Sequence, residues 1–249
     1  MRMTKMNQAR VVVVGGSSGI GLGVAQAALA AGAAEVVVAG RSTERLAAAE
    51  DALAAHGPGR VRAVPLDVTD EKQIRTFFEA VGPFDHLAIT AAETRYQALT
   101  AFDEGAARTV IESKLLGPVL LAKHAAARIR PGGSITLTAG VASERPLPKG
   151  ALVAAVNGGL MALGRALALE LAPIRVNVVS PGWIDTPVWD RLVGTAVGGK
   201  AAAFAAMAAR LPVGRIGTPA DVAAAFLFLM QNGFTTGTTL HVDGGHQLV

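Results

Sequence analysis

The sequence contains no cysteine, a single tyrosine and few aromatic residues of any kind. Without cysteine there can be no disulfide framework, no zinc site with thiolate ligands and no cysteine nucleophile in this chain of 249 residues. A nucleic-acid-binding surface usually combines clustered basic residues with stacking aromatics. Here aromatics make up 4% and the basic residues are scattered, so we expect no nucleic acid partner. The net charge of +4 suits a small anionic ligand equally well.

Long hydrophobic runs are also missing. The longest uncharged apolar stretch, residues 150–164, falls short of the roughly 18 to 20 residues that span a bilayer. Residues 1–10 are polar and lack the apolar core of a signal peptide. The five histidines show no metal-ligand spacing, so we expect no metal. We therefore expect a cytoplasmic protein with no membrane partner.

Short apolar strands alternate with helical patterns along the chain, which is 51% hydrophobic. The expected strands cover residues 10–14, 36–39, 61–66, 86–90, 134–138, 175–179 and 239–242. The expected helices cover residues 20–31, 42–55, 70–81, 102–129, 150–171, 200–210 and 219–231. This alternation predicts an α/β fold with a doubly wound parallel sheet, in one domain over residues 1–249. Ligands of such sheets bind where the carboxyl ends of the strands meet.

The first expected strand leads directly into a glycine-rich turn and then a helix. The turn is Gly15-Gly16-Ser17-Ser18-Gly19-Ile20-Gly21. Gly15 would permit the sharp bend, and the later glycines would let a pyrophosphate approach the amino end of the helix. The alternative is a purely structural glycine turn. We predict that a dinucleotide contacts Gly15, Ser17, Ser18, Gly19, Ile20 and Gly21.

With this turn the chain resembles the short-chain dehydrogenase/reductase family, which has a Rossmann fold. The resemblance also rests on Asp67-Val68, on residues 175–182 (RVNVVSPG) with Thr186 downstream, and on residues 242–245 (VDGG). It implies that Asp67 and Val68 meet the adenine ring and that Ile184 and Thr186 hold the nicotinamide carboxamide. The other cofactor-binding residues that it implies are Ala91, Pro181 and Gly182. Val14 departs from the family, which usually has Thr there.

The end of the second expected strand bears on the choice of cofactor. An acidic residue usually stands there to bind the ribose 2′-hydroxyl of NAD, and Gly40 occupies that position here. Arg41 follows, and a guanidinium group matches a 2′-phosphate. We therefore expect NADP(H) rather than NAD(H). The alternative is that Arg41 is a solvated arginine at the start of a helix.

The four catalytic positions of the family are all changed. Its members use Asn, Ser, Tyr and Lys, and the Tyr passes a proton as hydride moves. Local alignment places Lys114 at the Asn position, Gly140 at the Ser position, Val153 at the Tyr position and Asn157 at the Lys position. Val153 cannot transfer a proton, and Gly140 has no side chain to donate a hydrogen bond. The ordinary carbonyl reductase mechanism is therefore not expected.

Lys114 and Asn157 exchange the residue types of the family, so an ammonium and an amide would both remain in the pocket. We hypothesise that Lys114 contacts the cofactor ribose or supplies the missing positive charge; the alternative is a lysine extending from a helix into solvent. Glu93 and Tyr96 follow the fourth expected strand, and residues 143–145 follow the fifth. Each is a candidate functional residue in the search for a proton donor, since a Glu in an apolar pocket could act as an acid, and each could instead be a solvated loop residue.

Three functions remain open. The first is an NADP(H)-dependent oxidoreductase whose small-molecule substrate, an imine or a conjugated system, needs no proton from Tyr. The second is a non-redox enzyme on the same fold, and the third is a catalytically silent cofactor-binding protein. The resemblance also implies a substrate lid at about residues 183–212 with Trp183 and Trp189 on the pocket wall. It further implies a homo-oligomer, a tetramer first and a dimer second.

Overall fold

The computed structural model describes residues 6–193 and 198–249. Within these residues the strands form one seven-stranded sheet of order β3-β2-β1-β4-β5-β6-β7, with every neighbouring pair parallel. The strands are β1 (Arg10–Val14), β2 (Glu35–Gly40), β3 (Arg60–Pro65), β4 (Phe84–Ile89), β5 (Ile129–Thr138), β6 (Arg175–Pro181) and β7 (Thr239–Val242). The strand order reverses direction between β1 and β4, which confirms the doubly wound α/β fold.

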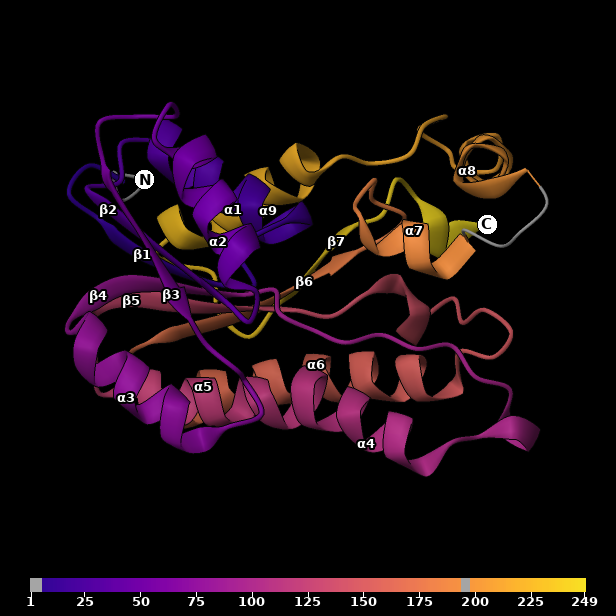
Figure 1. Cartoon of the computed structure of the whole chain (residues 1–249), viewed down its shortest axis with the longest axis horizontal. Coiled ribbons are helices and arrows are strands. Elements are labelled where there is room, and N and C mark those ends of the chain that lie inside the picture. Colours follow the sequence, from indigo (N-terminus) through magenta and orange to yellow (C-terminus); the bar gives the residue numbers. More distant parts are fainter. Residues whose placement is uncertain (1–5, 194–197) are drawn as a thin grey trace.

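Helices cover both faces of this sheet (Figure 1). One face carries α1 (Gly19–Ala30), α2 (Thr43–Leu53) and α9 (Pro219–Gln231). The other carries α3 (Glu71–Val81), α4 (Glu104–Ile111), α5 (Gly117–Ala126) and α6 (Ala151–Glu170). Two buried apolar layers result, because each face of the sheet and the helices above it exclude water. Phe226 and Leu29 belong to one layer, and Phe78 and Leu121 to the other.

Local capping residues explain where several helices begin. The Ser42 hydroxyl accepts a hydrogen bond from the Arg45 N–H at 3.3 Å, and the Asp70 carboxylate accepts one from the Gln73 N–H at 3.1 Å. Both contacts satisfy N–H groups that the first turn of a helix leaves without an acceptor. The starts expected at residues 42 and 70 are therefore confirmed.

The long helix expected over residues 102–129 is confirmed in outline, because residues 104–126 are helical without a break, but it contains an unexpected π-helical turn. It consists of α4, the π-helical turn η2 (Glu112–Leu116) and α5, and it follows a 3₁₀ turn (Leu99–Ala101). Pro118 has no N–H, so the Lys114 carbonyl lacks the donor that a regular α-helix would provide. The Gly117 N–H instead bonds to the Glu112 carbonyl, which widens the turn. The apolar periodicity continues through this wider turn, and for that reason the sequence suggested one helix.

Helix α6 confirms the helix expected over residues 150–171. It spans 20 residues, and its most apolar window has a mean hydropathy of 1.6, enough to cross a membrane by length and composition alone. Among its buried residues are Val153, Asn157 and Leu160. One such helix is weak evidence for a membrane span, because a helix that packs on the core of a sheet meets the same criteria.

The segment after β6 contains α7 (Val188–Val193) and leads to α8 (Gly199–Ala208), beyond one end of the sheet (Figure 1). Trp189, in α7, contacts both the residues just after β6 and helix α8. Its ring centroid lies 4.2 Å from that of Trp183 and 5.5 Å from that of Phe204, and its Nε1–H donates to the Ile184 carbonyl at 2.8 Å. Residues 194–197 of the expected lid lie outside the described residues, and closure of this segment stays a prediction.

Candidate active site

A cleft of about 770 Å³ lies at the carboxyl edge of the sheet. It is lined by residues that directly follow β1, β2, β3, β4, β5 and β6, because parallel strands all end at this edge. The lining contains every cofactor-binding residue expected from the sequence: Gly15, Ser17, Ser18, Gly19, Ile20, Gly21, Arg41, Asp67, Val68, Ala91, Pro181, Gly182, Ile184 and Thr186. Residues far apart in the sequence are thus brought into one site.

The glycine turn has no room for side chains. A Cβ atom at Gly21 would lie 2.2 Å from the Gly15 carbonyl oxygen, and one at Gly15, where φ is +92°, would lie 2.4 Å from the Ala91 nitrogen. In this described segment the Ser18 side chain makes no capping hydrogen bond to α1. The first N–H groups of α1 therefore remain suited to an anion such as a pyrophosphate.

The turn after β3 contains Asp67 and Val68, the two residues predicted to contact adenine. The Asp67 carboxylate accepts hydrogen bonds from the Thr69 N–H at 2.9 Å and the Thr69 hydroxyl at 2.8 Å. The Asp67 N–H donates to Gln73 Oε1 at 3.1 Å. These contacts hold the turn against α3, with Asp67 and Val68 lining the cleft.

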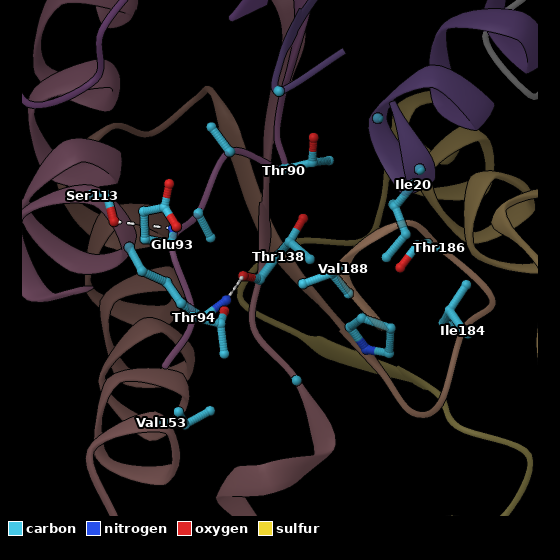
Figure 2. A pocket seen from close by; sticks show the side chains of 18 of the residues that line it. Ile20, Thr90, Glu93, Thr94, Ser113, Thr138, Val153, Ile184, Thr186 and Val188 are labelled. Atoms are coloured by element: carbon cyan, nitrogen blue, oxygen red, sulfur yellow. Dashed lines mark hydrogen bonds between the residues drawn. The ribbon is translucent and has the colours of Figure 1, made fainter. Parts of the chain in front are cut away.

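The exposed Arg41 side chain has an ion-pair partner in the structure. Its guanidinium group forms an ion pair with Glu93, which follows β4, and both residues line the cleft. The Glu93 N–H donates to the hydroxyl of the buried Ser113 at 3.1 Å, a contact that Figure 2 shows as a dashed line. The ion pair thus connects the end of β2 with the loop after β4.

Val153 and Gly140, which the sequence analysis aligned with the family's Tyr and Ser, both line the cleft and carry no group able to transfer a proton. Val153 on α6 is buried and lines the cleft (Figure 2). Gly140 follows β5 in an extended conformation, and a Cβ atom there would lie 3.0 Å from Asn157 Nδ2. The Asn157 amide therefore packs against the main chain where the family has a serine side chain.

Lys114 reaches from η2 to the end of β5 and does not extend into solvent. Its side chain is buried, with Nζ 3.4 Å from the Thr138 carbonyl oxygen and 3.5 Å from that of Ala139. Both distances are long for hydrogen bonds of an ammonium group. Burial lowers the pKa of Lys114 to about 8, because the charged form loses hydration.

Asn157 approaches the same region from the opposite helix. Within the described part of the chain its buried Oδ1 has no hydrogen-bond partner. A buried amide oxygen without a donor is costly unless a ligand or water supplies one. The structure therefore places an ammonium group and an amide acceptor in one cleft, the arrangement that the exchanged residues predicted, while their roles stay predictions.

The other candidate proton donors occupy different surroundings. Tyr96 lines the cleft and packs on the loop before α6, since a Cβ atom at Gly150 would lie 3.2 Å from its ring. Burial raises the pKa of Tyr96, so its phenol stays protonated. The Ser143 hydroxyl donates to the Glu144 carboxylate at 2.8 Å, and among these described loop residues only Arg145 of 143–145 lines the cleft.

His246 was not predicted, although it is buried and lines the cleft. The Asp243 carboxylate accepts hydrogen bonds from the Gly245 and Gln247 N–H groups, both at 2.9 Å, and so fixes the C-terminal turn. Burial lowers the pKa of His246, Arg210 and Arg145 act in the same direction, and Asp243 opposes them. The only sequence signal was the glycine pair before it, which gives no indication of where the ring points.

The described residues hold no group of three or more histidine, aspartate or glutamate side chains that could bind a metal ion. The site is thus composed of glycine main chain, a few charged groups and apolar walls. It can bind an extended anionic molecule along the strand ends. It offers a second ligand an ammonium group, an amide and an imidazole.

Comparisons with known proteins agree with this site. A family profile described as Enoyl-(Acyl carrier protein) reductase matches residues 14–247. The short-chain dehydrogenase/reductase ucsE of an Acremonium species is 34% identical, over 97% of this chain and 96% of its own. The solved structure of MalC Reductase/Diels-Alderase from Malbranchea aurantiaca is 31% identical with a TM-score of 0.90, over 98% of this chain and 99% of that chain.

An NADPH-bound short chain oxidoreductase from Pseudomonas aeruginosa PAO1, described as containing an atypical catalytic center, is also similar. It is 31% identical with a TM-score of 0.88, over 98% of each chain. These likenesses extend over nearly the whole chain. The chain therefore belongs to the short-chain dehydrogenase/reductase family of oxidoreductases, whose members bind a nicotinamide cofactor.

Proposed function

We propose that this protein is an NADP(H)-dependent oxidoreductase that delivers hydride to a substrate needing no proton from a tyrosine, such as an imine or a conjugated system. One observation carries the proposal. The cleft retains the residues that suit a dinucleotide, and it is also lined by Val153 and Gly140, which the sequence alignment placed at the positions of the proton donor and its partner. A substrate that needs only hydride is compatible with both facts.

The cofactor would lie along the strand ends. The glycine turn and the amino end of α1 would bind the pyrophosphate, and Arg41 would bind the 2′-phosphate. Asp67 and Val68 would contact adenine, and Ile184 and Thr186 the carboxamide. When bound, NADPH supplies the hydride. The similarity to an NADPH-bound oxidoreductase supports NADP(H) over NAD(H).

A protonated imine fits the remaining groups. Hydride forms a new C–H bond at the imine carbon, the π electrons of the C=N bond move to nitrogen, and a neutral amine results without any proton transfer. The buried Asn157 Oδ1, which lacks a partner among the described residues, would accept a hydrogen bond from the N–H of the substrate. In a conjugated carbonyl, hydride adds at the β-carbon and water protonates the resulting enolate.

Titration calorimetry with NADPH and NADH tests the cofactor assignment. We expect micromolar NADPH binding and much weaker NADH binding. Turnover is then followed by the loss of NADPH absorbance with cyclic imines, enones and simple ketones. Imine or enone reduction without ketone reduction is expected. No binding of either cofactor would refute the proposal, and equal rates on simple ketones would refute the role assigned to the missing tyrosine.

A second candidate is a non-redox reaction in the same cleft. It is favoured by the similarity to a structure described as Reductase/Diels-Alderase and by the apolar wall that includes Trp183 and Val153. Product formation without cofactor consumption would support it. Tight cofactor binding with no turnover of any substrate would instead favour a silent cofactor-binding protein.

A further inference from the structure

The Arg41–Glu93 ion pair has a particular place in the sheet. β1 lies between β2 and β4, and the two partners follow β2 and β4 respectively. Neighbouring strands lie about 4.8 Å apart, so the pair spans about two strand spacings at the end of β1. The glycine turn starts at this same strand end. The pair therefore lies on the path that a dinucleotide would take from this turn toward the end of β2.

The two partners differ in exposure. The Arg41 side chain is 55% exposed, whereas that of Glu93 is only 19% exposed. The Glu93 main chain is fixed by its N–H donating to Ser113, whose hydroxyl in turn contacts the Val110 carbonyl at 3.4 Å. A fixed carboxylate thus holds a guanidinium group that solutes can still reach. Such a partly exposed pair is weak enough to be exchanged for another anion.

We propose that Glu93 is a specificity-determining residue that competes with the cofactor 2′-phosphate for Arg41. This inference rests on the proposed NADP(H) function and adds a second determinant to it. NADPH must displace the carboxylate from Arg41 and tolerate its negative charge close to the phosphate. NADH carries an uncharged hydroxyl at that position, so it incurs neither cost. Glu93 therefore lowers the preference for NADPH below what Arg41 alone would give.

The test is a double-mutant cycle on cofactor binding. Calorimetric titrations with NADPH and NADH are made on the wild type, Glu93→Gln, Arg41→Leu and the double variant. Glu93→Gln leaves the main-chain bond to Ser113 in place and removes the negative charge of the side chain. Glu44→Gln is the matched control, because Glu44 lies in the first turn of α2, three residues from Arg41, and is not among the described residues that line the cleft. Circular dichroism verifies that each variant is folded.

We expect Glu93→Gln to tighten NADPH binding about threefold to tenfold and to leave NADH binding within about twofold. The gain should disappear in the Arg41→Leu background and be absent in Glu44→Gln. Unchanged or weaker NADPH binding by Glu93→Gln, or a gain that persists without Arg41, would overturn the inference while the proposed function stands. Failure of both the wild type and Glu93→Gln to bind NADPH would overturn both.

Discussion

The glycine turn after β1 and the segment after β5 border one cleft, yet they are constrained by different kinds of neighbour. At Gly21 a Cβ atom would lie 2.2 Å from a main-chain oxygen, which cannot move without the strand. At Gly140 a Cβ atom would lie 3.0 Å from the end of the Asn157 side chain, which can rotate. Packing of main chain against main chain thus preserves the cofactor end. The segment after β5 faces a side chain that can move, so we expect it to tolerate substitution without disturbing the fold.

Substitution in the glycine turn should have the largest effect. We expect Gly21→Ala to weaken NADPH binding by at least about a hundredfold, because the turn must shift away from its binding geometry. The clash should also destabilise the fold by about 1 to 3 kcal/mol. This cost exceeds the stability that alanine gains over glycine inside a helix. Calorimetry and urea unfolding measure both effects.

Gly158→Ala is the matched control for that variant. Gly158 lies within α6 and has no heavy atom within 4 Å of an added Cβ atom. Alanine should therefore stabilise the helix by about 0.5 to 1 kcal/mol. If Gly21→Ala and Gly158→Ala had the same free energy of unfolding, the contrast between the crowded main chain around Gly21 and the open space around Gly158 would be refuted.

Removing the buried ammonium group should have the next largest effect, and it should depend on pH. The pKa of Lys114 is about 8 in the folded state, because burial lowers it from the ordinary lysine value of 10.5. Between these values the unfolded chain binds more protons, so Lys114 makes the wild type more stable as pH rises. Relative to Lys114→Met, the free energy of unfolding should increase by about 1 to 3 kcal/mol from pH 7 to pH 10.

Urea unfolding at several pH values measures this difference. Lys72→Met, which removes an exposed ammonium group from α3, controls for the change in net charge. Curves for the wild type and Lys114→Met that run parallel from pH 7 to pH 10 would show that the ammonium group is hydrated, contrary to the structure.

The smallest effect on stability is expected at Gly140, because its nearest neighbour is a side chain that can move. Gly140→Ser should cost less than about 1 kcal/mol, because the backbone there is extended and the Asn157 amide can move aside. The variant should also bind NADPH as the wild type does. Thermal unfolding and calorimetry test this, and a loss above about 2 kcal/mol would show that the Asn157 amide is as fixed as the main chain around Gly21.

Local patterns determined much of the fold and of the cofactor end. Alternating strands and helices, the caps Ser42 and Asp70, and the glycine turn all depend on residues close together in the sequence. For that reason the sheet edge and the glycine turn could be predicted from local patterns, whereas the other cofactor-binding residues were implied by the family resemblance. The same resemblance aligned Val153 with the family's Tyr, and residue identity then establishes that Val153 cannot transfer a proton.

Other features depend on contacts between distant segments, and only the tertiary structure decided them. Lys114 lies in a π-helical turn and its ammonium group contacts the end of β5, an arrangement that apolar periodicity does not reveal. The ion pair of Arg41 with Glu93 and the place of His246 in the cleft join residues that no local pattern relates. Propensity and capping act within a few residues, whereas the direction of a side chain in a site depends on how whole elements pack.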